Sequence, residues 1–136
     1  MRYWLLKSEP NDYGYEDLES DGKTRWDGVK NNLALKHMRT VKPGDQALIY
    51  HTGKEKAAVG IARVTSAPYP DPELDDERLV VFDIEPERRL ERPVTLAEVK
   101  ADPFFQDFAL ARVPRLSVMP VTAAYWKRLL RMARAG

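Results

Sequence analysis

Short apolar runs bounded by turn residues recur along the chain, and each run is typical of a strand in a sheet. The first covers residues 3–6 and ends before Pro10, which has no backbone N–H to donate to a ladder. Because side chains alternate along a strand, Tyr50 and His51 lie on opposite faces, and both line one site only if the strand ends or bulges there. Gly60 suggests a bend or a close backbone approach. The remaining runs predict strands over residues 46–51, 59–64, 78–90 and 115–119.

Between these runs, apolar residues repeat every three to four positions, which predicts short helices. Thr95 and Glu98 have the spacing of a capping box, so one helix is predicted to begin at Thr95. Another helix follows Asn31 and carries an apolar stripe of Ala34, Met38 and Val41. A last helix begins after Thr122, with a buried side formed by Trp126, Leu129, Leu130 and Ala133. Three aromatic residues before it are predicted to lie in the core: Phe104, Phe105 and Phe108.

Several strands with interspersed short helices, and no regular alternation of strand and helix, predict an α+β fold. We expect a small, mixed and strongly bent β-barrel that is closed or nearly closed on itself and flanked by the helices. Neither a linker nor a shift in composition divides residues 1–136, so a single domain is expected.

Composition narrows the classes of function. The chain has no cysteine, and its two histidines, His37 and His51, are not spaced as a ligand pair, so no metal is expected. No apolar run reaches the roughly 20 residues of a membrane span, and no signal peptide is recognisable, so a cytoplasmic protein is expected. The net charge is only +1, but basic residues cluster in one stretch that suits a polyanion: Lys30, Lys36, Arg39 and Lys42.

Residues 26–32 read Trp-Asp-Gly-Val-Lys-Asn-Asn and combine an aromatic ring, a glycine, two amides and a cation. The charges of Arg25 and Asp27 on either side of Trp26 predict that its ring is not deep in the core. Two interpretations fit this stretch: Trp26 closes one end of the core, or it forms one wall of a pocket for a planar ligand. Polar residues also follow the first strand, at a position where binding residues are often found: Lys7, Ser8 and Glu9.

Six blocks, in order along nearly the whole chain, carry a resemblance to a known family. They are residues 3–10 (YWLLKSEP), 26–31 (WDGVKN), 44–45 with 50–51 (GD and YH), 59–62 (VGIA), 69–72 (YPDP) and 115–121 (RLSVMPV). These blocks resemble the EVE domain family of the PUA-like group, which is related to the YTH and ASCH domains. The resemblance implies a small β-barrel whose pocket accepts a nucleobase, in a family thought to read modified bases in DNA, chiefly modified cytosines.

The resemblance also implies which residues form the site. A base taken out of its stack is held against aromatic rings and is read along its polar edge, and lysine and arginine hold the phosphates. The residues expected around the base are Ser8, Glu9, Trp26, Asn31, Tyr50, His51, Leu116, Ser117, Val118 and Pro120. Those expected at phosphates are Lys7, Lys30, Lys36, Arg39, Lys42 and Arg115.

Two positions depart from the family pattern. The usual arginine after Trp-Asp-Gly-Val is Lys30 here, which keeps the charge but loses the planar fork that suits phosphate. The insert that follows residues 69–72 is shortened to residues 73–78, so this chain has fewer residues there to contact a ligand.

The expected function is a non-catalytic module, without a cofactor, that binds nucleic acid carrying a modified base, with DNA favoured over RNA. One alternative is an RNA-binding module, because PUA-like barrels often bind RNA. A weaker alternative is a hydrolase acting on a modified nucleoside, because ASCH-like relatives include hydrolases. Against the hydrolase, the sequence shows no nucleophile with an adjacent base and orienting group. Sequence alone does not indicate the oligomeric state.

Overall fold

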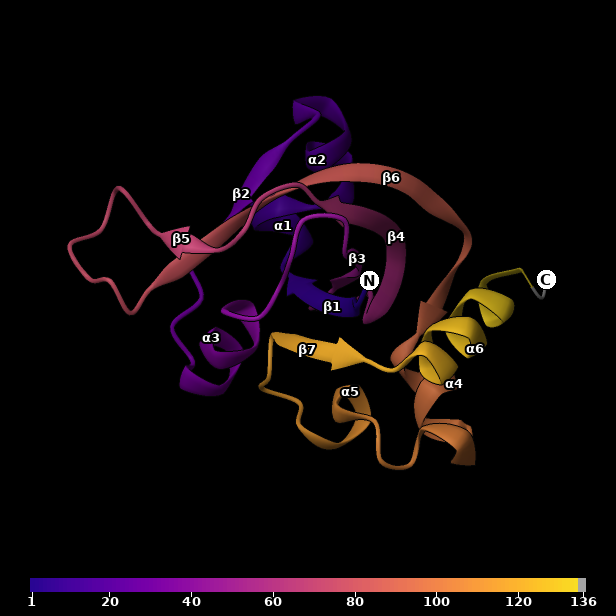
Figure 1. Ribbon diagram of the computed structural model, residues 1–136. Helices are drawn as coiled ribbons and strands as arrows, with labels where there is room; N and C mark the ends of the chain where they lie inside the picture. The colour runs from indigo at the N-terminus through magenta and orange to yellow at the C-terminus, as the bar shows by residue number, and fades with distance from the viewer. Residues whose placement is uncertain (135–136) are drawn as a thin grey trace.

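The computed structural model describes residues 1–134, which form a curled, mixed, seven-stranded sheet with short helices around it (Figure 1). The strands are β1 (Tyr3–Ser8), β2 (Thr24–Trp26), β3 (Gln46–His51), β4 (Ala57–Val64), β5 (Tyr69–Pro70), β6 (Val80–Thr95) and β7 (Val118–Val121). The helices are α1 (Pro10–Tyr13), α2 (Tyr15–Asp21), α3 (Asn32–Met38), α4 (Leu96–Ala101), the 3-10 helix η1 (Pro103–Phe105), α5 (Ala109–Arg112) and α6 (Ala123–Arg134). The predicted α+β fold with a strongly bent sheet is confirmed.

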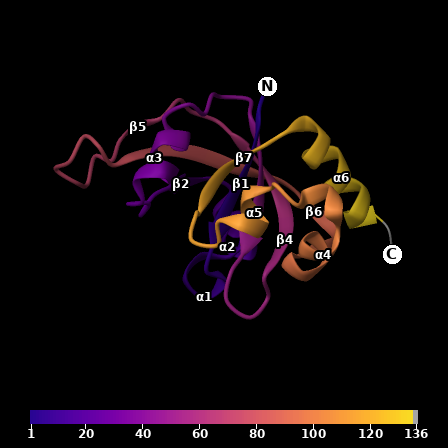
Figure 2. The same cartoon turned by 90° about the horizontal axis from the view of Figure 1, so that it is seen from below.

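The sheet curls because the long strand β6 pairs with different partners along its 16 residues. Its first residues pair with β2 and β5, and the rest pair with β4 through two register shifts. Such irregularities increase the bend of a strand. The strand order is β2-β6-β4-β3-β1-β7, and the edge strands β2 and β7 do not pair with each other. The result is a half-barrel that is open along the seam between β2 and β7 (Figures 1 and 2).

The centre of the sheet holds a parallel pair, β1 and β3, whose bounds lie close to the predicted strands. Because the two strands are parallel, Lys7 lies opposite Tyr50, Ser8 lies opposite His51, and both strands end at the same edge of the sheet. The β3–β4 register shifts between Ile49 and Tyr50, so the strand is irregular next to Tyr50 and His51. This edge is therefore where polar side chains from distant parts of the chain meet.

Helix α2 rests on β4 through a contact that only glycine permits. A Cβ atom at Gly60 would lie 2.4 Å from Cε1 of Tyr15, so the predicted close approach at Gly60 is confirmed. The Tyr15 hydroxyl donates a hydrogen bond to the Ile61 carbonyl oxygen at 2.6 Å. Burial raises the pKa of Tyr15 to about 12, so the hydroxyl remains a donor at neutral pH.

The two predicted helix caps are confirmed. The Glu98 amide donates to Thr95 Oγ1 at 3.1 Å and the Thr95 amide donates to Glu98 Oε1 at 3.1 Å, which completes the capping box of α4. Thr122 Oγ1 accepts from the Tyr125 amide at 3.1 Å at the start of α6. Helix α6 then packs along β6 with Trp126, Leu129 and Ala133 buried (Figure 1). No helix within residues 1–134 has the length and apolar character needed to cross a bilayer.

Some local predictions differ from the structure, among them the strand predicted over residues 78–90, which runs from Val80 to Thr95. Phe105 and Phe108 are buried, but Phe104 is 44% exposed, because Phe104 is held in an edge contact with Phe105 at the outer side of the cluster. The last strand begins at Val118 instead of residue 115, since only Val118 to Val121 pair with β1. Strand β2 was not predicted, because its three residues are too short to show an alternating pattern.

Candidate functional site

A hollow of about 380 Å³ lies at the open seam of the half-barrel, and we call it the first hollow. Its walls come from the end of β1, helix α1, the segment after β2 and the residue before β7. Its volume falls within the range of small-molecule sites in proteins. Its lining residues are Lys7, Ser8, Glu9, Asp12, Tyr13, Trp26, Asp27, Gly28, Val29, Lys30 and Ser117.

Trp26 lines the first hollow and also belongs to the core. Its exposed fraction is only 7%, so the prediction that its charged neighbours keep it out of the core was wrong. Strand β2 explains this burial: Trp26 pairs with Phe82 and turns its ring inward, while Arg25 is half-buried and Asp27 is exposed. Trp26 therefore closes the core and also lines the hollow, and the binding of a planar ligand against it stays a prediction.

Tyr13 is the second aromatic residue of the first hollow, and the sequence argument missed it. Its hydroxyl donates to Asp21 Oδ2 at 2.8 Å, which holds the half-buried ring in place. Burial, the largest contribution, raises the pKa of Tyr13 above its ordinary value, so the hydroxyl stays protonated and neutral. The hollow thus has two aromatic residues at its walls, one from α1 and one from β2.

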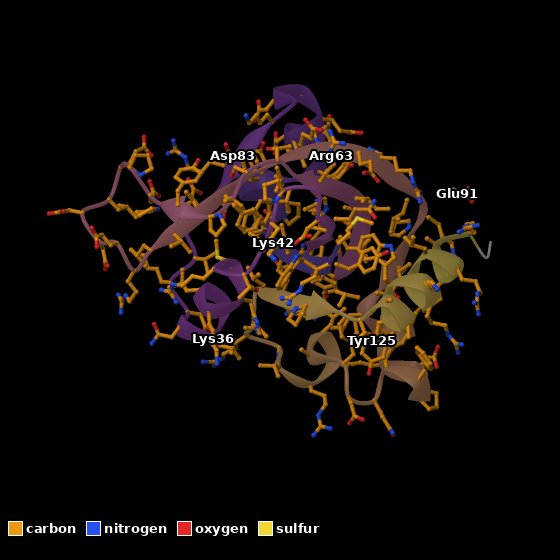
Figure 3. All side chains as sticks on the ribbon, in the orientation of Figure 1. Lys36, Lys42, Arg63, Asp83, Glu91 and Tyr125 are labelled. Carbon is orange, nitrogen blue, oxygen red and sulfur yellow. The ribbon has the colours of Figure 1, made fainter. Side chains whose placement is uncertain are left out.

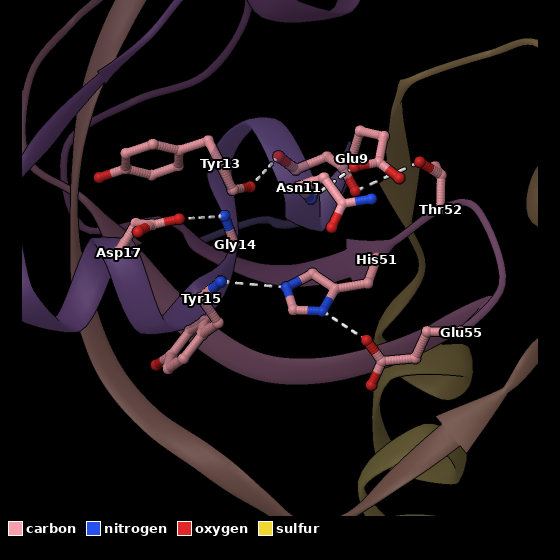
Figure 4. Close-up of polar contacts among 10 residues, drawn as sticks. Glu9, Asn11, Tyr13, Gly14, Tyr15, Asp17, His51, Thr52 and Glu55 are labelled. Carbon is pink, nitrogen blue, oxygen red and sulfur yellow. Dashed lines mark hydrogen bonds and ion pairs between the residues drawn. The ribbon is translucent and has the colours of Figure 1, made fainter.

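Ser8 and Glu9, both expected around the base, line the first hollow, but each already forms hydrogen bonds within the protein. Figure 4 shows Glu9 beside Asn11. Ser8 Oγ donates to the carbonyl oxygen of Tyr13. Glu9 caps α1 by accepting from the Asn11 amide, and its other oxygen, Oε1, lies against Gly53. These contacts fix the β1–α1 turn and leave fewer hydrogen-bonding positions free for a ligand.

Two carboxylates that the sequence argument did not select are the better candidates for contacts to a ligand. Asp12 and Asp27 are both exposed and line the first hollow. Among residues 1–134, neither carboxylate accepts a hydrogen bond or forms an ion pair. The hydroxyl of Ser117, which was predicted to lie in the site, is likewise without a partner in the described chain. These three groups remain available to a bound molecule.

A second hollow of about 280 Å³ lies on the other side of Lys7 and shares that residue with the first. Lys7 is half-buried, its Nζ donates to the Pro114 carbonyl oxygen at 2.9 Å, and it lies 5.7 Å from the centre of the Tyr50 ring. Burial lowers the pKa of Lys7. The lining residues of the second hollow are Lys7, Tyr50, Thr52, Gly53, Lys56, Leu96, Lys100, Leu110, Ala111 and Pro114. Tyr50 thus lies here and not with Trp26.

His51 lies outside both hollows, although the resemblance implied a place beside the base. Its exposed fraction is 8%, its Nε2 accepts from the Tyr15 amide at 3.0 Å, and its Nδ1 lies 2.7 Å from Glu55 Oε1 (Figure 4). An Nε2 that accepts must carry no proton, so the ring is a neutral tautomer with its proton on Nδ1. The role of His51 is to hold the start of α2 against the sheet.

Four further residues expected around the base do not line the first hollow. Asn31 caps α3, because its Oδ1 accepts from the Ala34 amide at 3.0 Å. Leu116 and Val118 are buried in the core. Pro120 is exposed on β7, beside Trp4 of β1. The apolar surface of the hollow comes instead from Val29, which is half-buried.

The expected phosphate contacts are also dispersed. Lys7 and Lys30 line the first hollow, whereas Lys36, Arg39, Lys42 and Arg115 line neither hollow. Lys36 projects from the exposed side of α3 (Figure 3). The Arg39 guanidinium donates to the Arg78 carbonyl oxygen at 2.7 Å and so holds the end of residues 71–78, which we call the acidic loop. No group of three or more potential metal ligands occurs within residues 1–134.

A curled half-barrel with a charged and aromatic hollow at its seam defines a binding domain of the PUA-like kind. The chain belongs to the EVE domain family, whose model matches residues 2–132. Among named relatives, thymocyte nuclear protein 1 of Danio rerio is 32% identical over an alignment that covers 93% of this chain and 70% of the relative. That alignment runs over 162 residues, more than the 136 of this chain, so the relative carries insertions that this chain lacks.

Solved structures agree with this assignment. Rpa0253 from Rhodopseudomonas palustris is 41% identical with a TM-score of 0.92, and the match covers 98% of this chain and 93% of that one. Human THYN1, solved in complex with DNA containing 5-methylcytosine, is 26% identical with a TM-score of 0.91 and covers 100% of this chain and 99% of that one. The YTH domain of Zygosaccharomyces rouxii MRB1 shares the fold, with a TM-score of 0.61 at 16% identity.

Proposed function

We propose that this protein is a non-catalytic reader of a modified base, and that its ligand is a modified cytosine in DNA turned out of the stack into the first hollow. A base inside a duplex is stacked on both faces and paired along its edge, so a protein hollow reaches it only after it leaves the helix. Unstacking costs a few kcal/mol, which aromatic walls and edge contacts in the hollow must offset.

The observation that carries the proposal is the pair of unpartnered carboxylates, Asp12 and Asp27, beside the aromatic residue Trp26. Cytosine differs from thymine in presenting an N4 amino donor where thymine presents an O4 acceptor. A carboxylate accepts from that amino group and repels the O4 of thymine. Val29 offers an aliphatic surface for an added methyl group, and Ser117 offers a further hydrogen-bonding group.

The solved relative supports the choice of nucleic acid. Human THYN1, at 26% identity and nearly complete coverage, was crystallised with DNA containing 5-methylcytosine. The YTH domain that was crystallised with N6-methyladenosine RNA is only 16% identical, so its likeness supports the fold alone. For this reason DNA is proposed ahead of RNA.

The proposal is tested by titrating the protein with short labelled strands that differ only at one central base: cytosine, 5-methylcytosine or thymine. Each strand is made as DNA and as RNA, single and paired. We expect 5-methylcytosine DNA to bind tightest. Its advantage over cytosine should be about fourfold, since a buried methyl group contributes about 0.8 kcal/mol. Equal affinity for the three bases would overturn the proposal, tighter binding to the RNA strands would replace DNA by RNA, and release of an altered nucleoside would establish an enzyme.

A pair of variants tests the carboxylates themselves. Asp12→Ala and Asp27→Ala should each reduce the preference for 5-methylcytosine over thymine by about tenfold or more, because a hydrogen bond to a charged group contributes about 1.5–3 kcal/mol. Asp75→Ala is the matched control, since it removes the same charge from an exposed position in the acidic loop, outside both hollows. The carboxylates have no role in reading if all three variants keep the wild-type ratio.

A further inference from the structure

We propose that the second hollow is a subsite for the nucleotide next to the modified one on the same strand, with its phosphate at Lys7, Lys56 and Lys100 and its apolar parts against Tyr50 and Leu110. This inference rests on the proposed function, because it assigns the first hollow to the base. It adds a defined path for the strand, from the seam across Lys7 to the end of β3.

The second hollow adjoins the first, because Lys7 belongs to both. Lys7 of β1 lies opposite Tyr50 of β3, and its side chain lines both hollows. A strand whose base enters the first hollow therefore has its neighbouring phosphate within the range of the shared lysine. The Pro114 carbonyl oxygen accepts from Lys7 Nζ at 2.9 Å, which fixes the position of this charge between the hollows.

The two hollows differ in the charge of their lining residues. Three lysines and no carboxylate line the second hollow, whereas Glu9, Asp12 and Asp27 accompany the two lysines of the first. Phosphate is therefore repelled from the first hollow and attracted to the second. Between the lysines, the second hollow presents the apolar parts of Tyr50, Leu96 and Leu110, of which Tyr50 and Leu110 belong to the core. A charged rim around an aromatic and aliphatic floor suits a nucleotide better than it suits a free inorganic anion.

The backbone conformation of Lys56, at the rim of the second hollow, supports the proposal independently. Lys56 has a φ of 47°, and it is the one residue other than glycine with a positive φ within residues 1–134. A side chain in this conformation costs roughly 1–2 kcal/mol, and glycine would avoid the cost. The Leu96 amide donates to the Lys56 carbonyl oxygen at 2.8 Å and holds the turn. A lysine at a strained position on the rim of a hollow is a candidate for a functional residue.

Amide chemical shifts during titration with two trinucleotides test the proposal. One trinucleotide carries cytosine in the centre and the other carries 5-methylcytosine. We expect both to shift the amides of Thr52, Gly53 and Ala111 in the second hollow, because both have the same phosphates. Both should also shift Gly28 and Val29, but the cytosine trinucleotide should need about four times the concentration of the modified one to reach the midpoint of that shift. The subsite is overturned if the second-hollow amides stay in place with both strands.

The same spectra separate this inference from the proposed function. If both strands shift the second-hollow amides but Gly28 and Val29 do not distinguish the two bases, the base assignment fails and the phosphate subsite stands. If Gly28 and Val29 distinguish the bases while Thr52, Gly53 and Ala111 do not move, the subsite fails and the reader stands. If neither set moves, both are overturned.

A double variant supplies a quantitative check. Lys56→Ala with Lys100→Ala should weaken trinucleotide binding by about tenfold and make the slope of log K against log salt shallower by up to about 0.7, because the subsite holds one phosphate and each phosphate contact on a single strand contributes about 0.7. Lys127→Ala with Arg131→Ala removes the same charge from the exposed side of α6 and should leave the slope unchanged. Equal slopes in the two double variants would overturn the subsite.

Lys56→Gly should weaken binding while keeping or raising the free energy of unfolding, because it removes the strain along with the charge.

Discussion

The two hollows beside Lys7 are built from the same sheet edge, yet they differ in what forms their walls. The first hollow is walled by Trp26, a core residue, and carries three carboxylates. The second is rimmed by Lys56 and Lys100, which are exposed, and carries no carboxylate among its lining residues. Both hollows thus include core residues, but the first carries acceptors, whereas the second carries donors on an exposed rim.

This difference shows how a nearly neutral protein can bind a polyanion. The net charge of +1 provides little general attraction for DNA. If acceptors are confined to the hollow that takes the base and cations to the hollow beside it, each part of a nucleotide meets the opposite polarity. Specificity then depends on the first hollow, and the salt dependence of binding depends on the second.

The largest expected effect is on the free energy of unfolding, and it tests whether the first hollow shares a wall with the core. Trp26→Ala should lower the free energy of unfolding by about 3–5 kcal/mol, because the ring is 93% buried and truncation leaves a cavity. Lys100→Ala should change it by less than about 0.5 kcal/mol, as surface substitutions do. Denaturant unfolding of both variants measures the difference. A Trp26→Ala variant as stable as the wild type would show that the first hollow does not share its wall with the core.

A smaller effect is expected at Gly53, which lines the second hollow and lies against Glu9 of the first. Gly53 has a φ of +76°, and a Cβ atom there would lie 2.8 Å from Glu9 Oε1. Gly53→Ala therefore carries the backbone cost of roughly 1–2 kcal/mol and must also displace Glu9, a lining residue of the first hollow. Gly22→Ala is the control, because Gly22 has a φ of +74° with open space around it. If denaturant unfolding gives the two variants the same stability, the contact with Glu9 is unimportant.

The smallest expected effect is on the pH dependence of oligonucleotide affinity. It concerns Lys7, the residue that lines both hollows. Burial lowers the pKa of Lys7 below its ordinary value of 10.5, so Lys7 loses its charge at a lower pH than an ordinary lysine side chain would. Oligonucleotide affinity should therefore begin to fall before pH 10.5 is reached. Lys7→Arg should remove this early loss, since arginine stays charged throughout. Identical pH profiles of the two proteins would contradict a phosphate contact at Lys7.

The fold was predictable because its signals are local. The alternating run of residues 46–51 became β3 with the same bounds, and the spacing of Thr95 and Glu98 marked the start of α4 correctly. β2 was missed because three residues carry no period, and Trp26 was placed outside the core because its charged neighbours concealed its pairing with Phe82. Whether the chain is one domain, and where in the cell it is found, remain predictions.

The site was less predictable because a polar residue near a turn can either contact a ligand or hold the local structure, for example by capping a helix. Asn31, Glu9 and His51 have the side chains expected of a base reader, but Asn31 and Glu9 cap helices and His51 holds the start of α2. Asp12 and Asp27 were not predicted as site residues, because exposed carboxylates are common on protein surfaces. Only the folded structure shows that these two remain without partners at the same hollow.

Tryptophan fluorescence tests the central claim most directly, since the other two tryptophans, Trp4 and Trp126, are buried and line neither hollow. The account predicts saturable quenching of the wild-type protein by a strand carrying 5-methylcytosine, and weaker quenching by the matched cytosine strand. It also predicts no quenching in Trp26→Phe, a variant that retains an aromatic wall. Equal quenching of the wild type and Trp26→Phe, or tight binding of the modified strand with no change in fluorescence, would contradict the placement of the base in the first hollow.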